Sequence, residues 1–317
     1  VLGGHQGGFR DLEGSGAGGG HEMKVAIPDL ISPSYFPLIA AVELGFLKAE
    51  LELLYPVTKT YEELREGRLD FVGGASHAAL YAFRDWKGGR LLCALAQHMY
   101  WFLVVRADLN ATRGDLSVVK NRRIGAAPGP VDGLKRLLQA SGIDPAKDVQ
   151  IGPVPGVVEK TASFGLMAAK ALEERKIDGF WANGMGAEVA VRSGIGTVVL
   201  DARREASAEA KGYTFPALVA TEKTTRERPE VARSAIKAVM AAQKALKENP
   251  ERATEVGRKL FPPAEASLIA ELIRRDAPFY DPAISPKSVE AMNRFARDIG
   301  LLSAFVPFEA VVWNPKN

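Results

Sequence analysis

The feature that most constrains the fold is an alternation of short apolar strands and amphipathic helices that begins near Met23. Runs rich in apolar and β-branched residues are followed by stretches with apolar residues at helical spacing. The expected strands are 24–27, 51–55 and 70–74, and the expected helices are 33–47, 61–66 and 75–84. Strands separated by helices of this length are joined by crossovers, so they predict a parallel sheet flanked by helices.

The same order of elements recurs further along the chain. The second set has expected strands at 123–126, 149–154 and 177–181 and expected helices at 131–140, 166–175 and 187–192. The sequence 64–70 is echoed by 172–178, and both place a basic residue, an aliphatic residue and an aspartate between a helix and a strand. A pattern that repeats after about 100 residues predicts two similar α/β lobes in one chain.

Two extended segments connect the predicted lobes. The segments 97–105 and 212–220 are expected to cross between the lobes and to form a hinge. Lobe one is predicted from 23–101 plus 217–317, and lobe two from 102–216. Beyond Arg228 the pattern is nearly all helical and is punctuated by prolines. Helices that pack around lobe one are expected at 229–248, 250–260, 264–275 and 286–299.

The first 22 residues are glycine-rich and contain no long apolar stretch. They are not expected to be a secretory signal, which has an apolar centre of about 7–15 residues. We predict that 1–22 is a tag or linker without ordered structure and that the natural or trimmed sequence starts at Met23. The rest of the chain has no run of the roughly 18 apolar residues that a membrane helix needs.

Composition and motifs argue against several classes of protein. The chain has 41 Lys and Arg against 38 Asp and Glu, with both signs interspersed, so no nucleic-acid-binding stripe is expected. Cys93 is the single cysteine, which excludes an internal disulfide, and no His or Cys spacing is typical of a metal site. The segment 74–78 is similar to a nucleophile elbow, but Ala78 replaces the final glycine and no suitable Asp and His follow, so a hydrolase is not expected.

Several segments occur in an order that resembles a known family. They are Tyr35–Lys48, Gly67–Phe71, Lys176–Gly179, Phe215–Ala220 and Arg228–Val231. Together they make the chain similar to the nitrate/sulfonate/taurine-type substrate-binding proteins of ABC importers, which share a fold with the thiamine-pyrimidine precursor synthases of fungi. The resemblance implies the two-lobed type II periplasmic-binding-protein fold, an α/β fold in which each lobe is a mostly parallel sheet flanked by helices.

The resemblance also implies a function and a location. Such a protein binds a small-molecule ligand and delivers it to an ABC importer permease, as a monomer with no cofactor, metal, nucleic acid or membrane span. Its location is periplasmic if a signal peptide was removed, and cytoplasmic if Met23 is the natural start. The alternative is a cytoplasmic lyase or synthase on the same fold, acting in cofactor or thiamine-pyrimidine precursor biosynthesis. The cysteine-rich motif of the fungal synthases has no counterpart here, because Cys93 stands alone.

Loops at the carboxyl ends of the strands are the expected ligand site, because open parallel α/β sheets bind ligands there. These loops are 29–36, 74–77 and 97–101 in lobe one and 127–132, 155–164 and 181–185 in lobe two. Aromatic residues are frequent in them and in the crossing segments, although core packing is the alternative for each. The predicted aromatic contacts are Tyr35, Phe36, Trp101, Trp181, Tyr213 and Phe215. Aromatic walls suit a planar, partly apolar ligand.

The polar side of the predicted site determines the expected class of ligand. The predicted polar contacts are Ser76, His77, His98, Gly129, Asp132 and Asn183. A structural role is the alternative for both histidines, and helix capping is the alternative for Asp132. Because Asp132 would repel a sulfonate or nitrate, a small inorganic anion is disfavoured. We favour an aromatic or heteroaromatic acid, with a neutral or cationic heterocycle contacted by Asp132 as the alternative.

Overall fold

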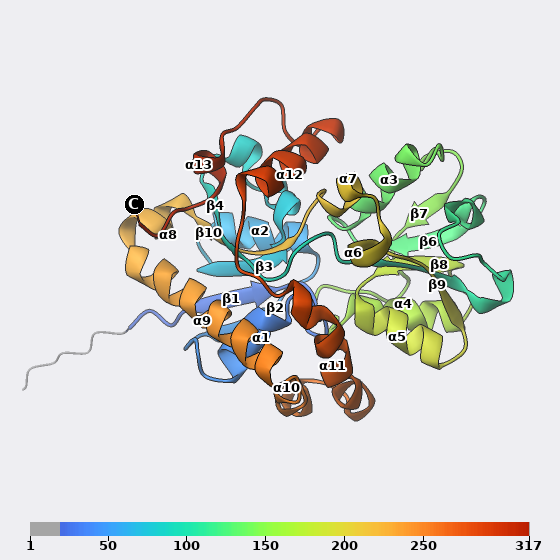
Figure 1. Ribbon diagram of the computed structural model, residues 1–317, viewed down its shortest axis with the longest axis horizontal. Coiled ribbons are helices and arrows are strands. Elements are labelled where there is room, and N and C mark those ends of the chain that lie inside the picture. The colour runs from blue at the N-terminus through green and yellow to red at the C-terminus, as the bar shows by residue number, and fades with distance from the viewer. Residues whose placement is uncertain (1–19, 317) are drawn as a thin grey trace, which may run out of the picture.

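The computed structural model describes residues 20–316 and contains two five-stranded sheets, one in each lobe (Figure 1). The predicted tag or linker at 1–22 therefore lies almost entirely outside the described residues. In lobe one the strand order is β2-β1-β3-β10-β4. The strands of this sheet are β1 (Lys24–Ile27), β2 (Glu50–Leu53), β3 (Phe71–Ala75), β4 (Gly89–Ala94) and β10 (Pro216–Thr221).

Lobe two repeats this topology with the order β7-β6-β8-β5-β9. Its strands are β5 (Phe102–Arg106), β6 (Arg123–Ala126), β7 (Gln150–Gly152), β8 (Gly179–Ala182) and β9 (Gly196–Asp201). Each sheet has one antiparallel strand, β10 in lobe one and β5 in lobe two, and each of these strands follows a crossing between the lobes. The other strands of a sheet share one direction. The predicted fold, two lobes with mostly parallel sheets, is confirmed.

Helices cover the faces of both sheets. Lobe one has α1 (Phe36–Glu43), α2 (Val57–Arg65) and the 3-10 helices η1 (Ser76–Tyr81) and η2 (Arg84–Trp86). Lobe two has α3 (Val131–Ala140), α4 (Phe164–Glu173), α5 (Gly184–Arg192), α6 (Ala202–Glu205) and α7 (Ala208–Lys211).

The helix expected within 33–47, with its end near Gly45, does end there, since Gly45 takes a φ of +81° that stops it. The prediction was wrong in two places. The segment 75–84 forms 3-10 turns instead of an α-helix, and strand β9 was not predicted.

The sequence echo between the lobes reflects one structural role. In lobe one, Asp70 accepts a hydrogen bond from the backbone N–H of Lys24, at the start of β1, at 2.9 Å. In lobe two, Asp178 accepts one from the backbone N–H of Arg123, at the start of β6, at 2.8 Å. Each carboxylate also pairs with a guanidinium, Arg228 at 2.7 Å in lobe one and Arg123 at 3.3 Å in lobe two. The repeated aspartates thus fix the first strand of each sheet.

The C-terminal part of the chain is helical, as predicted. Its helices are α8 (Glu222–Glu227), α9 (Pro229–Glu248), α10 (Arg252–Leu260), α11 (Pro263–Asp276), α12 (Pro286–Asp298) and α13 (Phe308–Val311). The long helix α9 packs on α1 of lobe one. The expectation that all these helices pack around lobe one needs correction, because α11 also contacts α5 of lobe two. Two ion pairs join them, Arg192–Glu271 at 2.6 Å and Arg275–Glu188 at 2.7 Å.

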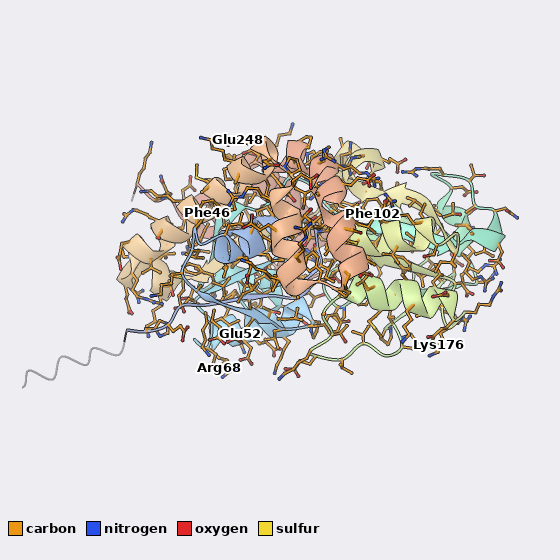
Figure 2. The ribbon with its side chains drawn as sticks, turned by 90° about the horizontal axis from the view of Figure 1, so that it is seen from below. Phe46, Glu52, Arg68, Phe102, Lys176 and Glu248 are labelled. Atoms are coloured by element: carbon orange, nitrogen blue, oxygen red, sulfur yellow. The ribbon has the colours of Figure 1, made fainter. Side chains whose placement is uncertain are left out.

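Hydrophobic residues form two clusters. The larger one fills lobe one, continues through the crossings and includes part of the lobe-two core with Leu134, Leu138 and Trp181. A smaller one lies inside lobe two around Phe164 and Phe180. Seen from below, Lys176 lies at the outer end of lobe two, on the opposite side of the molecule from Phe46 and Arg68 of lobe one (Figure 2). Within residues 20–316, no helix combines the length and apolar character that a membrane crossing requires.

Candidate functional site

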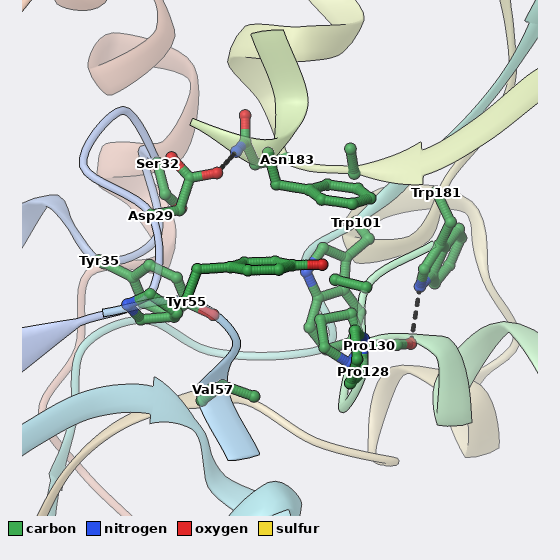
Figure 3. A pocket seen from close by; sticks show the side chains of 14 residues that line it. Asp29, Ser32, Tyr35, Tyr55, Val57, Trp101, Pro128, Pro130, Trp181 and Asn183 are labelled. Atoms are coloured by element: carbon green, nitrogen blue, oxygen red, sulfur yellow. Dashed lines mark hydrogen bonds between the residues drawn. The ribbon is translucent and has the colours of Figure 1, made fainter. Parts of the chain in front are cut away.

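A pocket lies between the two lobes, where the carboxyl ends of both sheets meet (Figure 3). Its cavity volume is about 40 Å³, below the roughly 300–1,000 Å³ of sites for drug-sized ligands, so a ring would enter only when the lobes move apart. Lobe one and the first crossing contribute Pro28, Asp29, Ser32, Tyr35, Tyr55, Val57 and Trp101. Lobe two contributes Ala127, Pro128, Pro130, Phe164, Trp181, Ala182 and Asn183. Most of these residues lie in the loops that the sequence predicted to face the cleft.

Aromatic rings form most of the pocket wall. Trp101 and Trp181 lie with ring centroids 5.9 Å apart at an angle of 47°. Tyr55 of lobe one stacks on Phe164 of lobe two, with centroids 5.9 Å apart and planes 12° from parallel. The indole N–H of Trp181 donates to the carbonyl of Pro130 at 2.9 Å, which fixes the ring. Rings held in this way present flat apolar faces to a ligand between the lobes.

One end of the pocket is polar and consists of Asp29, Ser32 and Asn183, which we call the polar corner (Figure 3). Asp29 follows β1 in lobe one, and its Oδ2 accepts a hydrogen bond from Asn183 Nδ2 of lobe two at 2.6 Å. Asn183 is the N-cap of α5, where its Oδ1 accepts from the backbone N–H of Met185 at 3.0 Å. The polar corner therefore joins the two lobes.

The carboxyl of Asp29 is almost fully buried, and this burial raises its pKa to about 7. Hydrogen bonds from the backbone of Ile31, the hydroxyl of Ser163 and the backbone of Gly165 and Phe164 act in the opposite direction and lower the pKa. Burial removes water from the charged form, and this effect is the largest. Asp29 is consequently a carboxyl whose protonation changes near neutral pH.

The remaining member of the polar corner is not satisfied by the protein. The side chain of Ser32 is buried, and its Oγ has no hydrogen-bond partner among the described residues. A buried hydroxyl without a partner costs about 1–3 kcal/mol, so such groups are rare in folded proteins. Because Ser32 lines the pocket, a ligand with a hydrogen-bonding group is able to supply the missing partner.

The structure brings four of the predicted ligand contacts into this pocket: Tyr35, Trp101, Trp181 and Asn183. Gly129 lies between two lining prolines, and its carbonyl is 3.2 Å from His77 Nε2.

Four other predicted aromatic or histidine contacts lie elsewhere, in packing positions. Phe36 is buried in lobe one against Phe261. Tyr213 stacks on Phe295 with centroids 4.6 Å apart. The ring of His98 packs edge-on against that of Phe279, with ring centroids 5.9 Å apart. Phe215 is buried at the start of β10, where its backbone N–H donates to the Ser76 hydroxyl at 3.3 Å.

The remaining predicted polar contacts form a second link between the lobes. His77 Nε2 of lobe one lies 3.1 Å from Asp132 Oδ2 of lobe two, and the Tyr81 hydroxyl donates to the same carboxylate at 2.9 Å. The other ring nitrogen of His77, Nδ1, lies 2.9 Å from the hydroxyl of Thr214, which is also 3.2 Å from the hydroxyl of Ser76. We call the contact of His77 and Tyr81 with Asp132 the rim bridge. The residues of the rim bridge and Ser76 are not among those that line the pocket, and their polar groups bond one another or Thr214.

Sequence reasoning singled out only four of the 14 lining residues, and those it missed include four with polar or aromatic side chains: Asp29, Ser32, Tyr55 and Phe164. Three of them lie in loops that were predicted to face the cleft, but they were not singled out. Tyr55 lies between β2 and α2, a connection that was not considered, although it also follows the carboxyl end of a parallel strand. The rule that ligands bind at the carboxyl ends of parallel strands would therefore have identified Tyr55.

Sequence and structure comparisons place this architecture among known proteins. A model of the NMT1-like family matches residues 133–260, from α3 to the end of α10. No curated protein gives a significant match. The alkanesulfonate-binding protein SsuA from Xanthomonas axonopodis pv. citri, bound to MOPS, is similar with a TM-score of 0.69 and 13% identity, over 92% of this chain and 98% of that chain. The periplasmic aliphatic sulphonate binding protein SsuA from Escherichia coli gives 0.64 and 13%, over 93% and 92%.

An enzyme shares the same architecture. A mutant of DSZB in complex with biphenyl-2-sulfinic acid is similar with a TM-score of 0.59 and 16% identity, over 89% of this chain and 93% of that chain. DSZB is described as a desulfurization enzyme. Identities this low establish a shared fold and leave the ligand open.

The chain has the two-lobed fold of these binding proteins, with a pocket between its lobes. The match to the NMT1-like family and the two SsuA structures confirm the resemblance that the sequence showed.

Proposed function

We propose that this chain binds a small aromatic or heteroaromatic molecule between its lobes and delivers it to an ABC importer permease. The observation that carries the proposal is the convergence of aromatic rings from both lobes and from the first crossing on one interlobe pocket. A ring that contacts both lobes binds the closed conformation more tightly than the open one, so it shifts the population toward closure. The closed form is the one that a permease would recognise.

The proposed ligand contacts are those predicted residues that line the pocket. Tyr35, Trp101 and Trp181 provide faces for a planar ring, and Asn183 lies at the polar end. The sequence favoured an aromatic or heteroaromatic acid over a neutral or cationic heterocycle. Among the described residues, the pocket lining contains no Lys, Arg or His side chain that could pair with the carboxylate of an acidic ligand. An acidic ligand would bring a second negative charge close to Asp29 in the polar corner, whereas a neutral or cationic heterocycle would not.

The proposed setting follows the relatives of the same fold. One of them is described as a periplasmic binding protein, which supports an extracytoplasmic role for this chain. That the chain acts as a monomer is part of the proposal. The rival is an enzyme, because DSZB has the same fold. The pocket lining includes no cysteine, and Cys93 lies inside β4, where burial raises the pKa of its thiol to about 12. A thiol in that state is a poor nucleophile.

The proposal is tested by titrating the protein with aromatic acids, pyrimidines and their neutral analogues in a calorimeter. We expect at least one ring compound to bind in the micromolar range and to be recovered unchanged. Trp101→Leu should weaken that binding at least fivefold, because it removes a ring face from the pocket. The matched control is Trp313→Leu, which removes an indole that contacts Arg233 outside the pocket. Circular dichroism verifies that both variants are folded.

Three outcomes would contradict the proposal. The first is that no ring compound binds. The second is that the Trp101 and Trp313 variants bind equally well, which would place the ligand elsewhere. The third is conversion of the ligand to a product, which would favour the enzyme.

A further inference from the structure

Two helices of lobe two begin side by side at the polar corner. A Cβ atom added to Gly186, in the first turn of α5, would lie 2.6 Å from the carbonyl oxygen of Gly165, in the first turn of α4. A Cβ added to Gly165 would lie 2.9 Å from Asn183 Oδ1. Larger residues would therefore separate the two helix starts. Asn183 Oδ1 accepts from the N–H groups of Met185 and Gly186 at the start of α5, so the anion position is formed by the start of α4, with about half a positive charge, and by the Asn183 amide.

The protein fills this anion position with its own carboxylate. Asp29 of lobe one accepts a hydrogen bond from the backbone N–H of Ile31 in its own loop at 2.9 Å, and the backbone N–H groups of Phe164 and Gly165, the first residues of α4, lower its pKa. It also lies within hydrogen-bond distance of both N-cap side chains, at 2.6 Å from Asn183 Nδ2 and 3.5 Å from Ser163 Oγ. These donors use the acceptor sites of a carboxylate, which number about four.

Beside Asp29 in the polar corner, the hydroxyl of Ser32 is the group without a hydrogen bond among the described residues. It is buried and lines the same pocket. An oxyanion entering the cleft would meet the charge of Asp29 at the position where the start of α4 and the Asn183 amide would otherwise bind it. An uncharged group would avoid that repulsion and could exchange a hydrogen bond with Ser32.

We propose that Asp29 is a specificity-determining residue that occupies the anion position of the cleft, so that the ligand is an uncharged ring bearing one hydrogen-bonding group for Ser32 and oxyanions are rejected. This inference rests on the proposed function, since it concerns the same pocket. It selects the neutral heterocycle over the acid.

Benzamide and benzoate provide the sharpest test, because they have the same shape and differ in charge. Binding of each is measured by calorimetry or ligand-observed NMR at pH 8, where Asp29 is ionised. Wild-type protein should bind benzamide at least tenfold more tightly than benzoate. Asp29→Ala vacates the anion position, so this variant should bind benzoate at least tenfold more tightly than the wild type does. Ser32→Ala is the matched control: it should weaken benzamide severalfold and leave benzoate unchanged.

The outcomes separate the inference from the proposed function. Equal binding of the two probes by the wild type, or tighter binding of benzoate, overturns the inference while the proposed function stands. Unchanged benzoate binding in a folded Asp29→Ala variant also overturns it. If that variant does not fold, Asp29→Ser serves in its place, and the wild-type ratio alone still decides. Failure of every ring probe to bind wild-type protein overturns the proposed function itself.

Discussion

Two carboxylates link the lobes, and they do so in opposite directions. Asp29 extends from lobe one and accepts from the amide of Asn183 in lobe two at 2.6 Å. Asp132 extends from lobe two and lies 3.1 Å from His77 Nε2 of lobe one, and it accepts from the Tyr81 hydroxyl at 2.9 Å. The first link is inside the pocket, and the second is at its rim, where 45% of Tyr81 is exposed.

The difference in burial assigns the two links different roles. A buried carboxylate depends on every donor around it, because each lost hydrogen bond leaves a charge without water. A link near solvent exchanges its hydrogen bonds with water at little cost and is screened by salt. We therefore expect Asp29 to govern stability and ligand choice, and the rim bridge to adjust only the balance between open and closed conformations.

The largest effect is expected when Asp29 loses its donor. Asn183→Ala removes both the N-cap of α5 and the hydrogen bond to Asp29, and we expect the free energy of unfolding to fall by about 3 kcal/mol. Asn183→Ser keeps a capping oxygen but is too short to reach Asp29, so about half of that loss should remain. Urea denaturation monitored by circular dichroism measures both. A serine variant as stable as the wild type would show that the buried link contributes nothing.

The next effect is a dependence of stability on pH. Asp29 has a pKa of about 7 in the folded protein, raised by burial from an ordinary value of 3.8. Between these two values the folded state holds a proton that the unfolded state has lost, so the free energy of unfolding contributed by Asp29 falls as the pH rises. The contribution is flat below about pH 4 and above about pH 8.

The variant Asp29→Asn isolates this contribution, because it has no titrating group at that position. Between pH 5 and pH 8 the wild type should lose about 2.5 kcal/mol relative to the variant, since each pKa unit corresponds to about 1.4 kcal/mol. Urea denaturation at a series of pH values measures the difference. Parallel pH profiles for the two proteins would contradict a raised pKa at Asp29.

Much of the fold could be predicted from the sequence because its signals are local. Periodicity located α3 and α9 at their observed bounds, and prolines marked the starts of the C-terminal helices. The missed strand β9 carries a β-branched run at 197–199 that was detectable. The segment 75–84 could not be told from an α-helix, because the pattern of apolar residues suits both an α-helix and the 3-10 turns that form.

The pocket was less predictable because it depends on contacts between distant segments. Asp29 and Asn183 are 154 residues apart, and nothing near either one indicates the other. The surroundings of His77 were unpredictable for the same reason, since His77 contacts Asp132 of the other lobe and Thr214, which is far from it in the sequence. A polar residue after a strand identifies the edge at which a ligand binds. Which of these residues face the pocket depends on how the lobes close.

The smallest effects are expected at the rim bridge. Tyr81→Phe removes one hydrogen bond to Asp132, and the free energy of unfolding should fall by less than about 1 kcal/mol. The fraction of open molecules should nevertheless rise, because the hydroxyl contacts Asp132 only when the lobes are closed. Small-angle X-ray scattering measures this as a larger radius of gyration without ligand, and saturating ligand should restore the wild-type value.

A matched variant separates lobe closure from a general effect of lost surface contacts. Glu290→Gln removes an exposed ion pair with Arg294 that lies within α12 and joins no lobes. It should change stability as little as Tyr81→Phe does and leave the radius of gyration unaltered. If the Tyr81 variant and the Glu290 variant scatter alike, the rim bridge has no part in closure, and the buried link at Asp29 joins the lobes without it.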